Sequence, residues 1–292
     1  MLGELESFKS NEDTGQRLVA DSTLVNYVWR TPHYLLGSTL QNPALSTPDL
    51  KTGAPTLKYA GISRQNRACG MLFDDPASNE ICAVEAVLEH GSGGRPQHSF
   101  WSVQHENVLI LQRIAPLGRS TLGSYSTDAV GIGFEGKALQ KVEEAGWIFA
   151  SNGKAFVGVK FLDGGYKWDE KHALSTPANF NKATDNSRIL LHAGDIASDG
   201  SFEKFQSAVL GNDLKVTADK VDYQFGVTGN HIEVTRYDPQ TPDRFALPLI
   251  NGKPVDLHPA KTYQSPYLDG DFGSDKISVN VGPVHRQLDF SK

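Results

Sequence analysis

Two histidines are the strongest candidates for chemistry in this chain, and both lie between residues 89 and 113. His98 and His105 flank the aromatic pair Phe100-Trp101 and follow a glycine-rich loop at residues 91–94. A neutral imidazole beside a cleft acts as a general base or as a metal ligand. Side chains alternate along a strand, so a joint metal site from this pair requires a bend or bulge between them. The alternative is a pair of surface or structural histidines.

A polar cluster and a loop tyrosine extend the candidate site. Arg64, Gln65 and Arg67 stand at the start of a predicted strand. Guanidinium groups bind carboxylates bidentately, so the cluster is a candidate for holding an acidic substrate. Its alternative is a solvated loop. Tyr125, in a Gly-Ser-Tyr-Ser loop, is a candidate acid or base in an elimination, and its alternative is an ordinary loop tyrosine.

The four tryptophans divide by context. Trp168 lies in the polar stretch 163–170, which we predict to be part of a long loop, and it is the best candidate for an exposed sugar-stacking surface. Trp29, Trp101 and Trp147 lie in apolar strand contexts, where aromatic side chains are expected to fill the core.

No sequence motif identifies a cofactor for this chain. The chain has no Walker loop, no dinucleotide-binding glycine fingerprint, no H-E-x-x-H and no G-x-S-x-G. His192 and Asp195 are two candidate ligands of a metal, but their spacing favours a strand-end histidine followed by a turn aspartate. The cofactor is therefore left open, with a divalent metal such as zinc or calcium as the candidate.

The length and composition of the chain limit the kinds of protein it can be and the partners it can bind. The chain has 292 residues and a net charge of −6, and its sequence pI is about 5.8. A chain of this length can bury a large core. The absence of a basic stripe argues against a duplex nucleic acid partner. No apolar run reaches the roughly 18 residues that a membrane-spanning helix needs.

The sequence leaves the cellular compartment of the protein open. The first residues are polar and lack the apolar core of a signal peptide. The protein is expected to be cytoplasmic, or secreted or periplasmic if a signal has been removed. Cys69 and Cys82 flank a turn at residues 74–79 and fit either a disulfide or two buried thiols.

Strand patterns dominate the chain. We predict roughly a dozen or more short strands, with turn signals about every 8 to 15 residues. The clearest hairpins surround Asn152-Gly153 and Asn251-Gly252. One helix is predicted from Ser201 to Leu210, since its apolar residues recur at helical spacing. The pattern is typical of a large antiparallel β-sandwich, all-β with one short helix. We expect a polar N-terminal arm over residues 1–23 and a single domain over 24–292.

Several segments resemble the C-terminal β-sandwich domain of heparinase II/III-like polysaccharide lyases. The resemblance is carried by residues 27–38 (YVWRTPHYLLGS), by Arg95-Pro96 with the strand at 107–110, and by residues 247–255 (LPLINGKPV) and 263–268 (YQSPYL). It covers most of residues 24–290. In such lyases a helical toroid precedes the sandwich and supplies much of the cleft, including the usual catalytic tyrosine. This chain lacks the helical content of a toroid.

The resemblance implies a polysaccharide-lyase-type sandwich, of the supersandwich kind, that acts on or binds a uronate-containing polysaccharide. The implied chemistry is β-elimination, with His98 or His105 as the base, Arg64 or Arg67 neutralising the carboxylate and Tyr125 as the acid. The implied partners are a polysaccharide or oligosaccharide and an N-terminal toroid domain or partner chain. The alternative is a non-catalytic carbohydrate-binding or assembly module separated from its toroid.

Overall fold

The computed structural model describes most of the chain between residues 14 and 291. The described residues are 14–21, 24–41, 47–48, 55–56, 70–75, 80–88, 100–113, 130–137, 139–177, 187–227, 229–237, 246–255, 261–265, 267–271 and 274–291. Antiparallel strands make up most of them, so the prediction of an all-β fold is confirmed.

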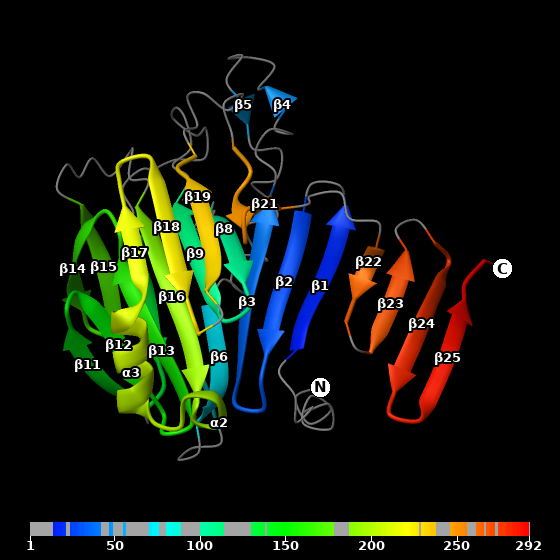
Figure 1. Ribbon diagram of the computed structural model, residues 1–292, viewed down its shortest axis with the longest axis horizontal. Coiled ribbons are helices and arrows are strands. Elements are labelled where there is room, and N and C mark those ends of the chain that lie inside the picture. Colours follow the sequence, from blue (N-terminus) through cyan, green and yellow to red (C-terminus); the bar gives the residue numbers. More distant parts are fainter. Residues whose placement is uncertain are drawn as a thin grey trace.

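The largest sheet has twelve strands and runs across the whole molecule (Figure 1). In spatial order its strands are β14 (Gly164–Asp169), β15 (His172–Pro177), β10 (Val130–Glu135), β7 (Glu80–Leu88), β6 (Gly70–Asp75), β3 (Tyr34–Gln41), β2 (Leu24–Arg30), β1 (Thr14–Asp21), β22 (Lys261–Gln264), β23 (Leu268–Asp271), β24 (Lys276–Val281) and β25 (Val284–Asp289).

A six-stranded sheet packs on part of this large sheet, and a five-stranded sheet covers the other side of the six-stranded one. The six strands are β11 (Gln140–Glu144), β12 (Trp147–Ser151), β13 (Ala155–Phe161), β16 (Arg188–Asp195), β9 (Val108–Arg113) and β8 (Phe100–His105). The five are β17 (Asp213–Val216), β18 (Lys220–Phe225), β19 (Asn230–Thr235), β20 (Leu249–Ile250) and β21 (Lys253–Pro254). A two-stranded ribbon pairs β4 (Thr47–Pro48) with β5 (Pro55–Thr56).

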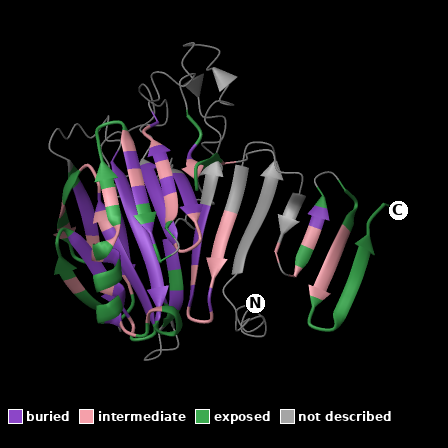
Figure 2. Cartoon of the chain, viewed as in Figure 1, coloured by how far each residue is buried: buried purple, intermediate pink, exposed green. Residues whose placement is uncertain are grey.

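The central strands of the six-stranded sheet are buried on both faces, which makes the sheet the middle of three layers. Leu109 and Leu111 of β9 face the core shared with the twelve-stranded sheet. Val108 and Ile110, one residue out of phase, face the core shared with the five-stranded sheet and the longer helix. β12 and β16 are buried along their whole length, as Figure 2 shows. The expected sandwich thus carries a third layer.

The predicted helix is α3 (Phe202–Gly211), which lies on the middle sheet. Its N-cap is Ser201, whose side chain accepts a hydrogen bond from the Lys204 N–H at 3.2 Å. Phe202, Phe205 and Val209 are its buried residues. A second helix, α2 (Ile196–Asp199), precedes it and was not predicted, because four residues are too few to show a helical period.

Two segments differ from the sequence-based expectations. Residues 14–21, expected to belong to a polar arm, form β1 between β2 and β22. Residues 164–177, expected to be part of a loop, form the β14–β15 hairpin, whose turn places Glu170 at φ +52°. β1 pairs with β22 and β15 pairs with β10, so a strand distant in sequence stabilises each of these segments, whose own patterns are weak.

Two smaller expectations concern cysteine and the membrane. Cys82 is buried on β7, whereas Cys69 lies outside the described residues, so their pairing stays untested. Across the described ranges, neither helix has the length and apolar character needed to cross a bilayer.

Candidate functional site

His105 lies where three hairpin turns from different parts of the chain converge. It ends β8 and precedes the β8–β9 turn, which contains Glu106. Asn230 begins β19, after the β18–β19 turn. Asn251 is in the β20–β21 turn, at φ +52°. We call His105, Glu106, Asn230 and Asn251 the three-turn site.

The imidazole of His105 lies between two side-chain amides. Its Nε2 is 3.4 Å from Asn230 Oδ1 and 3.4 Å from Asn251 Nδ2. Both contacts are longer than the usual 2.9–3.0 Å of an N–H···O bond. The ring is half-buried and meets Phe225 edge-on, with 6.2 Å between centroids. Nε2 therefore lies beside one donor and one acceptor without a short bond to either.

The two amides are held by groups other than the imidazole. Asn230 Nδ2 donates to Glu106 Oε2 at 2.9 Å, which turns its oxygen toward His105. Asn251 Oδ1 accepts from the His231 N–H at 2.8 Å, which turns its NH₂ group toward the same ring. Both amide orientations are thus set by a second hydrogen bond.

Glu106 adopts a backbone conformation that is costly for its residue type. Its φ is +50°, in a two-residue turn between His105 and Val108. The left-handed region costs a non-glycine residue roughly 1–2 kcal/mol. The carboxylate of Glu106 reaches Asn230 from this turn, so the conformation and the position of the amide are coupled.

A protonated tyrosine lies beside the same turn. Tyr27, on β2, accepts a hydrogen bond from the backbone N–H of Glu106. Burial raises its pKa to about 12, and the Glu106 carboxylate also raises it, whereas the backbone hydrogen bond lowers it. Its hydroxyl therefore keeps its proton at neutral pH.

Most of the sequence-based site residues lie outside the described part of the chain. They are His98, Tyr125, Arg64, Gln65 and Arg67. Their roles stay predictions. Of the residues proposed for catalysis, His105 is the one whose surroundings the structure describes.

Trp168 lies on β14 instead of in a loop, and it is half-buried. Its Nε1 donates to Glu143 Oε1 at 2.6 Å, and its ring packs 5.5 Å from that of Phe134. The Lys141 ammonium lies over the indole, 4.8 Å from its centroid. A sugar that stacks on this face has to displace Lys141, and sugar binding by Trp168 stays a prediction.

His192 and Asp195 are both buried on β16, three residues apart, and have separate partners. His192 Nδ1 lies 2.8 Å from the Tyr223 hydroxyl, and burial lowers its pKa to about 3. Asp195 Oδ1 caps α2 by accepting from the N–H groups of Ala197 and Ser198. The geometry fits a structural histidine and a helix cap.

A different group has the donor set of a metal site. Asp222, His231 and Glu233 lie on β18 and β19, and their ligand atoms are all within 4.8 Å of one another. One imidazole and two carboxylates are ligands that zinc accepts. At present Asp222 contacts His231 Nε2 at 2.9 Å, and Glu233 pairs with Lys220 at 2.6 Å. The residues therefore fit a divalent ion that replaces these two contacts.

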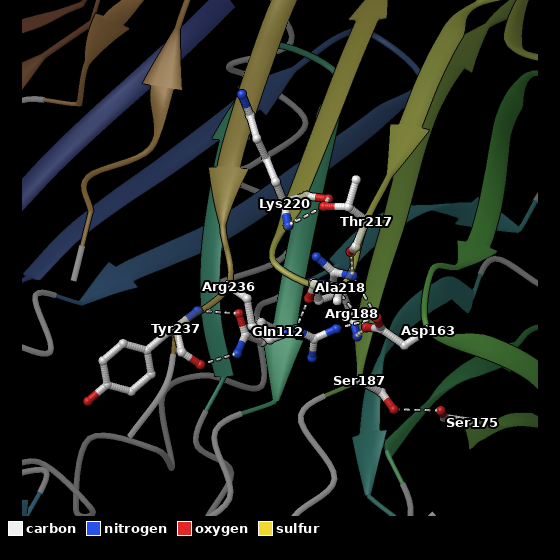
Figure 3. Close-up of polar contacts among 10 residues, drawn as sticks. All are labelled: Gln112, Asp163, Ser175, Ser187, Arg188, Thr217, Ala218, Lys220, Arg236 and Tyr237. Atoms are coloured by element: carbon white, nitrogen blue, oxygen red, sulfur yellow. Dashed lines mark hydrogen bonds and ion pairs between the residues drawn. The ribbon is translucent and has the colours of Figure 1, made fainter. Parts of the chain in front are cut away.

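A buried arginine lies at the other end of the middle sheet (Figure 3). Arg188 Nε and Nη2 donate to the two carboxylate oxygens of Asp163 at 2.9 and 2.6 Å. Nη2 also donates to the Thr217 carbonyl at 2.7 Å. Arg236 pairs with the same aspartate, and its pKa is lowered by burial and, to a lesser degree, by Arg188. This network ties the middle layer to the outer one.

Sequence reasoning found one member of the three-turn site and missed three. Asn251 belongs to an Asn-Gly hairpin that the sequence predicts, but the pattern of a turn gives no sign of a functional role. Glu106 and Asn230 show no signal in a single sequence, because neither residue type is unusual beside a turn.

Comparison with protein-family models, with curated proteins and with solved structures finds no match to this chain.

Proposed function

We propose that the three-turn site binds a uronate unit of an acidic polysaccharide and cleaves the chain by β-elimination. The observation that supports this best is the placement of two amides, Asn230 and Asn251, beside Nε2 of His105. An elimination next to a carboxylate needs a base, donors that stabilise the charged carboxylate and an acid for the leaving oxygen. The imidazole suits the base, the Asn251 amide suits the donor, and a nearby tyrosine suits the acid, while the Asn230 oxygen accepts a hydrogen bond beside them.

The proposed reaction starts at Nε2 of His105, which takes the C5 proton of the uronate. The C5–H electron pair forms the C4–C5 double bond, and the C4–O bond breaks with its electrons on the leaving oxygen. The amide NH₂ group of Asn251 donates to the carboxylate, where charge develops, while Asn230 keeps its own NH₂ group on Glu106 and turns its oxygen toward the site. Tyr27 supplies the proton to the leaving oxygen. Tyr125 is the sequence-based alternative for this acid.

The candidate metal ligands lie close along the chain to this site. His231 follows Asn230, and its N–H is the group that holds Asn251. A divalent ion bound by Asp222, His231 and Glu233 would supply Lewis-acid stabilisation of an anionic oxygen. The proposed β-elimination uses only the side chains of the three-turn site and Tyr27.

A non-catalytic carbohydrate-binding module is the second candidate function. Nε2 of His105 lies equally far from an amide oxygen and an amide NH₂ group. A sugar hydroxyl both donates and accepts, so it suits this arrangement without any proton transfer.

The experiment incubates the protein with a panel of uronate polysaccharides and follows the ultraviolet absorbance of the unsaturated product. Metal content is measured on the same samples. We expect product formation by the wild type and a loss of at least a hundredfold in His105→Ala. His172→Ala, at the start of β15, is the matched control and is expected to turn over normally. Binding without product would support the module, and neither binding nor product with any substrate would refute both.

A further inference from the structure

The last strand, β25, is an exposed edge of the twelve-stranded sheet. Among the strands that the structure describes, its one neighbour in the sheet is β24, and all six of its residues are exposed. Figures 1 and 2 show that β22–β25 extend beyond the other two layers. Strand edges with exposed backbone groups are templates for pairing with another strand.

The direction of the backbone groups follows from one hydrogen bond. The Phe290 N–H donates to the Asp275 carbonyl at 2.8 Å, so residue 290 points toward β24. Backbone direction alternates along an antiparallel pair. Since β24 and β25 pair in regular register, the N–H and C=O groups of His285, Gln287 and Asp289 point away from β24.

The two faces of β25 differ in chemistry. Val284, Arg286, Leu288 and Phe290 lie on one face, and the three apolar residues among them are 47%, 42% and 63% exposed. His285, Gln287 and Asp289 lie on the other face. The strand contains no proline and no lysine, and its pairing with β24 has no bulge. Proline and a bulge, two common devices that block edge pairing, are thus missing from β25, and its charged residues are Arg286 and Asp289.

We propose that β25 pairs antiparallel with β25 of a second copy of this chain, around a twofold axis at Gln287. This register uses every outward-pointing backbone group of the strand. It places His285 opposite Asp289 of the other copy, twice, and Val284 opposite Phe290. Imidazole meets carboxylate at the first pair, although His285 and Asp289 also contact Asn280 and Ser291 of their own chain, and apolar meets apolar at the second.

The proposed dimer is weak and depends on concentration. Arg286 lies opposite Leu288 in this register, so its aliphatic stem covers the leucine while its charge stays in water. Two short strands bury less area than a standard interface of about 1,600 Å². Dimers are therefore expected at high protein concentration and monomers on dilution.

The test is sedimentation velocity over a wide range of protein concentration. Gln287→Pro removes an outward N–H and leaves the β24–β25 bonds intact, so we expect at least tenfold weaker dimerisation. Gln287→Thr keeps the N–H and is the matched control, expected to dimerise like the wild type. Circular dichroism checks that both variants fold.

A charge exchange tests the register independently of proline. Asp289→His places imidazoles opposite each other and is expected to weaken the dimer. Adding His285→Asp restores both opposite pairs and is expected to restore the dimer. A wild type that stays monomeric at every concentration would overturn the proposal. So would dimers that are insensitive to Gln287→Pro.

Discussion

At the scale of single residues, the three-turn site combines an unusual backbone with a directed side chain. Glu106 holds Asn230, and the Asn230 oxygen faces His105. The left-handed φ of Glu106 places its carboxylate there at a cost in conformational energy. At Glu106, the backbone conformation that orients Asn230 therefore lowers the stability of the folded protein.

Two substitutions separate these effects. Glu106→Ala loses the hydrogen bond to Asn230 and keeps the unfavourable φ, so we expect a loss of about 1–2 kcal/mol. Glu106→Gly loses the same bond but accommodates the positive φ, so it should be more stable than the alanine variant by roughly 1 kcal/mol. Urea unfolding measures both, and equal stability of the two variants would show that the turn is unstrained.

A second residue-scale prediction concerns pH and His192. Burial lowers its pKa to about 3, below the unfolded value of about 6.5. The folded state binds this proton less readily than the unfolded state does. The contribution of neutral His192 to the free energy of unfolding is therefore complete above pH 6.5 and is lost as the pH falls toward 3. At pH 4 the loss is at most about 3 kcal/mol.

The matched variant is His192→Gln, which keeps a polar group near Tyr223 but does not titrate. Unfolding free energies at pH 7 and pH 4 should differ less in this variant than in the wild type. An identical pH dependence in the two proteins would contradict the assignment to His192.

At the scale of elements, helix α3 packs closely on β16 because Gly194 has no side chain. A Cβ at that position would lie 2.5 Å from the Phe205 ring and 2.5 Å from Asp199 Oδ2. Such an overlap forces the helix away from the sheet. The small residue therefore sets how closely helix and middle layer approach.

Gly194→Ala is expected to destabilise the protein by about 1–3 kcal/mol through this overlap. A Cβ at Gly211, the last residue of α3, would meet no atom within 4 Å. Gly211→Ala should therefore stabilise by roughly 0.5–1 kcal/mol. Thermal unfolding of the two variants gives the comparison, and shifts of the same sign would refute this account of the packing.

At the scale of the whole molecule, stability should fall from the middle layer to the C-terminal strands. β12 and β16 are buried along their length between two hydrophobic cores, whereas β25 is exposed throughout. Local opening is cheapest where few apolar contacts break. The middle sheet is expected to unfold with the molecule as a whole.

Amide hydrogen exchange tests this order at a protein concentration low enough for monomers. Amides of β12 and β16 should exchange with the free energy of global unfolding, and those of β24 and β25 much faster. Uniform protection over all these strands would contradict a graded stability.

Local patterns in the sequence determined the fold class, the helix near residue 202 and the Asn-Gly turn at residue 251. Each depends on neighbours along the chain. The helix has a capping serine and apolar residues at helical spacing, and the turn has φ values of +52° and +75°, which suit asparagine and glycine. The sequence also selected His105.

Only the tertiary structure decided what surrounds His105 and how the sheets are layered. Asn230 and Asn251 reach it across 125 and 146 residues of chain. A strand pattern shows which residues share a face, but it does not show which faces pack together or which turns meet. That depends on non-local strand pairing, which also placed β1 beside β22 and the middle sheet between two cores.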